Sequence, residues 1–313
     1  LLSAPGVVAA SLPWAKACIV LPVSILFSML YVKLKNTYDF EKAYYFVMGG
    51  FVSFFALFEF VLFPYKDIIH PSTELINIMQ SSIHPVFHNF LGLLGVWSFT
   101  MYYVMSELWG TYSLSVLFWQ FANDNVSTEE SKRFYPLFIM VGNIALLLLS
   151  YLLDYISSNY SGGAEIDLIN YTVMVAGISM MLLFKYININ VLTNPEFMPT
   201  STKKKKKKQK LSIMDSIREL SQSRYIMYVA ILVLSYGVMI NIFETVWKEQ
   251  LRASLMVDGV VNRSALLSKM SQYTFYTGIF TIVLNYLSKD TVRVFGWLTG
   301  AAITPIVCTL ASL

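Results

Sequence analysis

The chain of 313 residues has few charged residues and few cysteines, and each shortage excludes a class of protein. Charged residues make up 13% of the sequence, whereas hydrophobic residues make up 56% and aromatic residues 15%. This balance is too apolar for an ordinary soluble domain. Cys18 and Cys308 lie far apart in apolar stretches, which fits neither a disulfide framework nor a zinc site. The composition therefore predicts an integral membrane protein.

Catalytic motifs are lacking as well. The sequence contains no G-x-x-x-x-G-K-[ST] phosphate loop, no G-x-S-x-G turn and no H-E-x-x-H helix. His70, His84 and His88 have no cysteine near them, and their spacing is a weak signal for metal binding. We therefore predict no enzyme, no catalytic residue, no cofactor and no metal site, and an ATP-driven pump is disfavoured.

Long apolar runs are what the chain does contain. About 20 apolar residues are needed to cross a membrane, and we count eight candidate spans, at 14–34, 43–64, 92–122, 134–156, 168–187, 225–247, 271–288 and 292–313. The third is the longest, so we expect it to tilt, to kink at Gly110 or to hide a ninth crossing. The predicted fold class is an all-α polytopic helix bundle.

Lysine and arginine are distributed unevenly between the two sides of these spans. Most of the 23 such residues fall in one set of loops, at 33–42, 123–133, 185–224 and 289–293. Because cytoplasmic loops carry an excess of positive charge, we place this set in the cytoplasm.

The segment 188–222 is the longest polar stretch and divides the chain. It contains the lysine run 203–208, which is typical of a disordered, self-repelling linker. Apolar residues at helical spacing follow in 211–220 and predict an amphipathic helix on the membrane surface. Anionic membrane lipids are sufficient partners for the lysines. Nucleic-acid binding is not predicted, because no folded basic face accompanies them.

We therefore divide the chain into three parts: an N-terminal helix bundle at 1–187, the cytoplasmic linker at 188–222, and the first part of a C-terminal bundle at 223–313. Two six-helix halves joined by a long cytoplasmic loop are common among transporters. The chain begins with Leu1 and ends within an apolar run, so we interpret it as a fragment that holds about eight of twelve spans.

One acidic residue, Glu107, lies at the middle of the third span. A carboxylate at the centre of an inserted helix costs roughly 3 kcal/mol, so it normally faces a partner or a water-filled pathway. The alternative is a structural carboxylate that is hydrogen-bonded to one of its polar neighbours, Tyr102, Tyr103, Thr111 and Tyr112.

Several segments resemble, in order, the ATP/ADP translocase family of plastids and obligate intracellular bacteria, which is distantly related to the major facilitator transporters. They are SAPG at 3–6, YVKLKN at 31–36, YVMSELWG at 103–110, FWQFAND at 118–124, EESKRFYPLF at 129–138, SRYIMYVAILVLSYGVMINIFETVWKEQL at 223–251 and FGWLTGAAITP at 295–305. The resemblance implies a major-facilitator-like monomer of twelve spans that exchanges ATP for ADP. It also implies the inner membrane of an intracellular bacterium or the inner envelope of a plastid.

The resemblance assigns transport roles to Glu107, to Glu244 and, through a similar stretch, to Lys16. Lys248 follows Glu244 by four residues, a spacing that is also typical of an ordinary surface pair, and Lys16 could instead extend to the interface. Phosphates require cations or helix N-termini in a dry site. A carboxylate such as Glu107 would therefore act by pairing with the cation that binds phosphate.

The resemblance also suggests a cytoplasmic gate loop that contains Asn123, Asp124, Lys132 and Arg133. The alternative is a helix end and a solvated turn with positive-inside charges. Glu59 departs from the family pattern, which usually has a small or apolar residue there. It lies at the lipid-headgroup level or alters substrate or proton coupling.

Three functions are compatible with this sequence. The first is ATP/ADP antiport by alternating access. The second keeps the fold but changes the cargo, to proton-coupled import of nucleoside triphosphates or to another nucleotide such as NAD, for which Glu59 is the local indication. The third is a membrane scaffold that does not transport and is anchored by the lysine-rich segment.

Overall fold

The computed structural model describes residues 11–161, 163–194, 222–257 and 260–288, with isolated positions between 294 and 310. By its contacts the chain forms two compact units. The first consists of Leu1–Asn125 and Ile166–Val261, and the second of Val126–Glu165 and Asn262–Leu313. The lysine run and the expected amphipathic helix at 211–220 lie outside the described residues, so the boundaries drawn from the sequence remain predictions.

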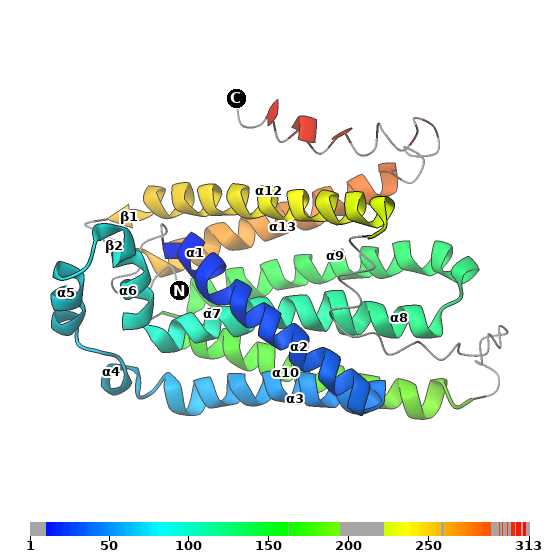
Figure 1. Cartoon of the computed structure of the whole chain (residues 1–313), viewed down its shortest axis with the longest axis horizontal. Coiled ribbons are helices and arrows are strands. Elements are labelled where there is room, and N and C mark those ends of the chain that lie inside the picture. The colour runs from blue at the N-terminus through cyan, green and yellow to red at the C-terminus, as the bar shows by residue number, and fades with distance from the viewer. Residues whose placement is uncertain are drawn as a thin grey trace. The chain divides into compact units, whose positions relative to one another are not determined.

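The first unit is built almost entirely of helices (Figure 1). Its first part contains α1 (Ser11–Trp14), η1 (Ala15–Val20), α2 (Leu21–Thr37), α3 (Phe40–Leu57), η2 (Phe58–Leu62), α4 (Lys66–Ile69), α5 (Thr73–Ser81), η3 (Pro85–Phe87), α6 (His88–Gly95), α7 (Trp97–Gly110), η4 (Thr111–Phe118) and α8 (Trp119–Asn125). Its second part contains α10 (Ala164–Tyr186), which begins two residues before this unit, η5 (Ile187–Val191), α12 (Arg224–Ser254) and the two-residue strands β1 (Met256–Val257) and β2 (Val260–Val261).

Four of these segments, η1, η2, η4 and η5, are π-helices that continue neighbouring α-helices. A π-helix is rare and occurs mostly as a short, wider turn within an α-helix, often at a functional site. Two of the candidate charged residues lie within such turns, Lys16 in η1 and Glu59 in η2.

Helix α3 supplies the centre of the core in the first unit. Tyr44, Val47, Met48, Phe51 and Phe55 recur at helical spacing along its sequence and are buried. They pack against buried side chains of α7, η4 and α10, including Val104, Leu108, Tyr112, Met174 and Phe184. Many large apolar side chains on the other faces are exposed, as expected where lipid rather than water surrounds a bundle.

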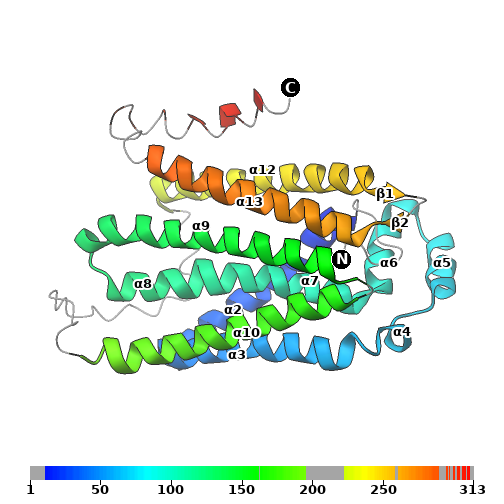
Figure 2. The same cartoon turned by 180° about the vertical axis from the view of Figure 1, so that it is seen from behind.

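Gly177 lets α10 approach two helices at once. A Cβ at this position would lie 2.6 Å from Val52 Cγ2 of α3 and 2.8 Å from the Trp109 ring of α7. Small residues at helix interfaces allow such close packing in membranes. The views from both sides show α3 and α10 next to each other (Figures 1 and 2).

The second unit contains α9 (Thr128–Asn159) and α13 (Arg263–Ser288), which pack side by side. The Ser271 hydroxyl of α13 donates a 2.8 Å hydrogen bond to the Ser150 carbonyl of α9. A Cβ at Gly278 would lie 2.9 Å from Leu147 Cδ2. Here too, small and hydroxyl-bearing side chains bring two apolar helices together.

Five described helices are long and apolar enough to cross a membrane: Ser11–Thr37, Phe40–Leu62, Glu129–Asn159, Ala164–Val191 and Arg224–Ser254. Each coincides with one of the eight spans predicted from the sequence, although the predicted span 43–64 runs two residues beyond Leu62. The chain is thus an all-α polytopic membrane protein, apart from the short β1–β2 pair.

The other predicted spans differ from this picture. The segment 92–122 is interrupted at Val96, and a continuous helix follows from Trp97 to Asn125 that is not among the five. At Gly110, where a kink is predicted, the α-helix changes to the π-helix η4. Helix α13 contains 271–288 and is not among the five either, and most of 292–313 lies outside the described residues.

Candidate functional site

A charged cluster joins η1 to α12 in the first unit. The Lys16 ammonium lies 2.7 Å from Glu244 Oε2 and donates a second bond of 2.7 Å to Asn241 Oδ1. Lys248 Nζ lies 2.5 Å from the other carboxylate oxygen, Glu244 Oε1. One carboxylate therefore binds two ammonium groups, and the cluster carries a net positive charge.

The helix period of α12 explains half of this arrangement. Asn241, Glu244 and Lys248 are spaced by three and four residues, so they share one face of the helix. The Ser223 hydroxyl caps the start of α12: it accepts a 3.4 Å hydrogen bond from the Ile226 amide. Lys16 comes from a π-helical turn 228 positions earlier in the sequence and completes the cluster from the other side.

All three charged side chains are partly shielded from the surroundings. The exposed fractions are 18% for Lys16, 20% for Lys248 and 34% for Glu244. Partial burial strengthens charge–charge attraction because it lowers the effective dielectric constant. Partial burial also makes an unpaired charge costly in free energy. If Glu244 moves away, the two lysines are left without a counter-charge and favour binding of an anion.

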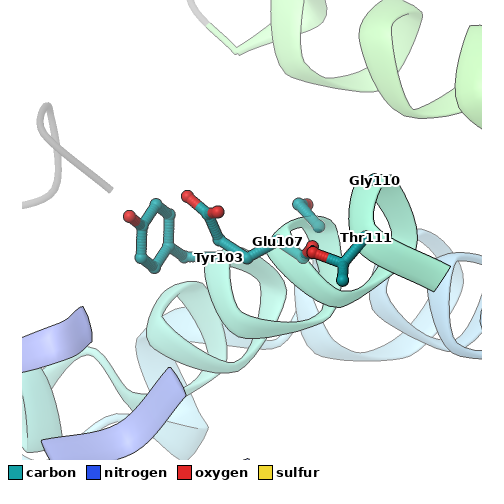
Figure 3. A pocket seen from close by; sticks show the side chains of 5 residues that line it. Tyr103, Glu107, Gly110 and Thr111 are labelled. Carbon is teal, nitrogen blue, oxygen red and sulfur yellow. The ribbon is translucent and has the colours of Figure 1, made fainter. Parts of the chain in front are cut away.

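Glu107 lines an open hollow of about 370 Å³ on α7 and the start of η4. The other lining residues are Tyr103, Ser106, Gly110 and Thr111 (Figure 3). Figure 3 shows the Glu107 carboxylate and the Tyr103 ring extending from the same side of the helix. Thr111 donates to the Glu107 backbone carbonyl rather than to the carboxylate. Within the described part of the chain a single helix lines the hollow, so these residues can receive part of a ligand but do not enclose one.

Tyr103 links this hollow to the charged cluster. Its hydroxyl is buried and interacts with the Glu107 carboxylate through a side-chain hydrogen bond. The carboxylates of Glu107 and Glu244 both act electrostatically on it. Its ring packs against the small buried cluster of Ala15, Leu93 and Val96, and Ala15 directly precedes Lys16. Both predicted acidic residues therefore lie around one tyrosine.

The predicted gate residues are divided between the two compact units. Asn123 and Asp124 are exposed near the end of α8, in the first unit. Arg133 is exposed on α9, in the second unit, and the Lys132 side chain is not described. A gate formed by these four residues stays a prediction.

Glu59 is buried within the protein, and its depth in the membrane stays a prediction. It is only 5% exposed and accepts a 2.8 Å hydrogen bond from Asn170 Nδ2 of α10. The sequence identified the carboxylate as unusual, whereas its partner was missed because Asn170 lies 111 positions away. Asn241 was missed for a different reason: its helical spacing to Glu244 was visible, but an amide next to an ion pair carries no distinctive signal.

Trp109 also has a clear place. Its ring lies 5.6 Å from those of Phe51 and Phe55, centroid to centroid, so it belongs to the packed core of the first unit.

The fold and site define a class: a polytopic helical membrane protein with a positively charged, partly buried cluster that joins two of its helices. The model of the TLC ATP/ADP transporter family matches residues 1–313, and the chain belongs to this family. No solved structure matches the chain.

Curated relatives extend this finding. ADP,ATP carrier protein 1 of Chlamydia pneumoniae is 34% identical over 325 residues, covering 100% of this chain and 62% of the relative. ADP,ATP carrier protein 1 of Rickettsia prowazekii (strain Madrid E) is 35% identical over 302 residues, covering 95% of this chain and 59% of the relative. The chain thus spans about three fifths of the length of the curated relatives that it matches.

Proposed function

We propose that this chain forms part of a membrane carrier that exchanges ATP for ADP by alternating access. The observation that carries the proposal is the Lys16–Glu244–Lys248 cluster within a chain of the TLC ATP/ADP transporter family. The transported nucleotides and the surrounding lipids are then its partners, and we propose that it works as a monomer. The inner membrane of an intracellular bacterium, or the inner envelope of a plastid, is the proposed location.

Competition between phosphate and carboxylate is the proposed mechanism. Without nucleotide, Glu244 pairs with both ammonium groups. Phosphate oxygens accept strong charge-assisted hydrogen bonds from lysine, each worth about 1.5–3 kcal/mol. An arriving nucleotide therefore displaces Glu244 from one or both lysines and separates η1 from α12. A change in the contact between two helices is the kind of event on which alternating access depends.

Glu107 supplies a second acceptor in this scheme. The carboxylates of Glu107 and Glu244 both act electrostatically on Tyr103, so the two carboxylates lie around the same side chain. A lysine that phosphate has released from Glu244 can therefore pair with Glu107 instead. Glu107 then pairs with the cation once the nucleotide has left. Asn123, Asp124, Lys132 and Arg133 are proposed to close the cytoplasmic end.

Uptake of labelled ATP by vesicles that contain the full-length protein tests the function. Uptake should rise when the vesicles hold ADP, as exchange requires. Lys16→Gln should weaken nucleotide binding roughly 10-fold or more, since it removes one charge-assisted contact. Glu107→Gln should lower the exchange rate sharply, and uptake unchanged by Glu107→Gln would contradict its assigned role.

The role of Glu244 needs a separate measurement. Glu244→Gln frees both lysines for phosphate, so nucleotide binding should be kept or tightened while the exchange rate falls. Glu249→Gln removes a carboxylate five residues further along the same helix and should change neither quantity. Loss of nucleotide binding in Glu244→Gln, with normal folding, would overturn the competition mechanism.

A scaffold that does not transport predicts no nucleotide-dependent shift in thermal stability.

A further inference from the structure

Lys16 has a second acceptor on α12, and this acceptor carries no charge. The Lys16 ammonium donates hydrogen bonds of 2.7 Å to Glu244 Oε2 and to Asn241 Oδ1. Both bonds run from η1, which precedes the lysine run 203–208, to a helix that follows it. Lys248, by contrast, reaches Glu244 from within α12. Lys16 is therefore the member of the cluster that ties two distant parts of the chain together.

The Asn241 amide is oriented for this contact by its own helix. Its nitrogen donates a 2.8 Å hydrogen bond to the Gly237 carbonyl, one turn earlier. The oxygen of the same amide therefore faces Lys16, where it accepts. Because an amide does not titrate, Asn241 holds the ammonium without adding a charge to the cluster.

Apolar packing gives α12 little support in the described part of the chain. Among the described residues of this 31-residue helix, Arg252 alone is buried, whereas α3 buries a row of side chains from Ala43 to Phe55. The large apolar side chains of α12 are exposed, as expected toward lipid. The hydrogen bonds from Lys16 are therefore important for the contact between η1 and α12.

Separation of η1 from α12 breaks both of these bonds. A phosphate group has several oxygens, so a bound nucleotide replaces the carboxylate and the amide together with charge-assisted hydrogen bonds. In an empty carrier, Glu107 takes the place of Glu244 but leaves Asn241 unreplaced. The partly buried Lys16 ammonium then has fewer acceptors than before, which disfavours the movement.

We propose that Asn241 is a positioning residue that holds Lys16 on α12 in the empty carrier and so makes movement depend on nucleotide. The proposal rests on the nucleotide exchange proposed above and extends it to the empty state. A carrier that changed access without cargo would leak nucleotide in one direction rather than exchange it. Asn241 therefore opposes leakage. It also opposes nucleotide binding, because phosphate must displace it from Lys16.

Uptake of labelled ATP by vesicles that contain the full-length protein tests this role. Wild-type uptake should depend on ADP inside the vesicles. Asn241→Leu keeps the size of the side chain but removes the acceptor, so uptake without internal ADP should rise roughly 10-fold and the KM for ATP should fall. Asn241→Asp has the same shape and binds Lys16 more strongly, so its KM should rise.

Asn190→Leu is the matched control for these variants. Asn190 is also exposed in an apolar helix, and its amide nitrogen makes the same kind of bond, to the Tyr186 carbonyl one turn earlier. Asn190→Leu should leave both the KM and the dependence on internal ADP as they are in wild type.

Electron paramagnetic resonance without nucleotide provides a readout that does not depend on transport. Spin labels are placed on the exposed Cys18 of η1 and on Ile242→Cys, an exposed position of α12, in protein whose other cysteines are replaced. Wild type should show one short distance between the labels. Asn241→Leu should add a longer distance, because the contact then opens without nucleotide.

The outcomes separate this inference from the proposed function. A wild type that takes up no ATP into ADP-loaded vesicles would contradict the proposed function. Wild-type exchange combined with an unchanged KM, ADP dependence and label distance in Asn241→Leu would contradict the role of Asn241 alone. A purely structural role predicts lower thermal stability of Asn241→Leu without a fall in KM, which would also exclude the proposal. If Asn241→Leu does not fold, a KM that is not raised in Asn241→Asp decides against it.

Discussion

Glu244 bonds to two lysines at once, and this determines how each partner responds to substitution. Removal of one lysine leaves the other paired with the carboxylate, so the net charge of the cluster becomes zero. Removal of Glu244 leaves two ammonium groups next to each other, which repel one another and attract an anion. Opposite changes at one site should therefore affect nucleotide binding in opposite directions.

His70 provides a prediction outside the apolar spans. Its Nε2 lies 2.7 Å from Ser98 Oγ, and burial lowers its pKa below the ordinary value of 6.5; Lys66 adds to this shift and Asp67 opposes it. The unfolded chain therefore takes up the proton first as pH falls. The stability from neutral His70 is complete above pH 6.5 and is lost as pH decreases through the lowered pKa.

His70→Gln should flatten this acid-side loss, because glutamine keeps a polar contact with Ser98 but does not titrate. The measurement is the melting temperature across the acidic range, with His84→Gln as the control on an exposed histidine. A slope that is the same in His70→Gln and wild type would show that the histidine does not contribute.

Sequence reasoning reached some of these residues and not others. The Glu244–Lys248 pair was visible because a helix brings positions four apart together. The Lys16–Glu244 pair was not, because no local rule relates residues 228 positions apart. Glu107 and Glu59 stood out as carboxylates in apolar segments, but only the fold could show that one faces an open hollow and the other a buried amide.

At the scale of helices, Gly177 controls the packing of α10. Gly177→Ala places a methyl group within 3 Å of Val52 and Trp109, and overpacking of this kind costs about 1–3 kcal/mol. Gly50→Ala in α3 is the control, because nothing lies within 4 Å of its added Cβ. Thermal unfolding in detergent should show a clear loss for Gly177→Ala and no loss for Gly50→Ala. Equal stability of the two variants would contradict the close packing.

The start of α9 is fixed by a capping box. Ser127 Oγ accepts the Glu130 amide at 3.3 Å, and Glu130 Oε2 accepts the Ser127 amide at 3.0 Å. Ser127→Ala should cost about 1 kcal/mol, whereas Ser127→Asp, which keeps an acceptor at the cap, should largely preserve stability.

Because the predicted gate residues flank this cap, transport by Ser127→Ala is informative. A lowered melting temperature with normal exchange would mean that the cap is structural. A loss of exchange in Ser127→Ala that Ser127→Asp restores would favour the gate.

The π-helical turns are the elements that the sequence did not reveal. Segments such as FEFVL in η2 and TYSLSVLF in η4 have the same apolar composition as the α-helices around them. Periodicity over so few residues cannot separate the two forms.

At the scale of the whole molecule, hydropathy predicts only some of the spans. Five spans coincide with long apolar helices because hydropathy alone identifies them. The helix Trp97–Asn125 is not apolar enough to be identified by hydropathy, because it contains Glu107 and many hydroxyl-bearing side chains. These are the side chains that suggest function. The polar side chains that make this helix a candidate functional element thus hide it from a hydropathy scan.

Orientation remains a prediction and can be tested. The lysine run 203–208 should be cleaved by trypsin only when the protease reaches the cytoplasmic face. Inside-out vesicles should therefore release two fragments, whereas right-side-out vesicles should protect the run until detergent is added. Cleavage in right-side-out vesicles alone would reverse the topology.

The π-helices also affect how this chain should be aligned with its relatives. A wider turn accommodates an extra residue, and one residue more or less rotates everything beyond it by about 100° around the helix axis. A relative with an ordinary α-turn in place of η1 would need a one-residue gap there to keep the lysine facing α12. If the gap is misplaced by a few positions, the alignment matches Lys16 to a lipid-facing residue of the relative. A lysine that is present in both proteins would then be misread as a substitution.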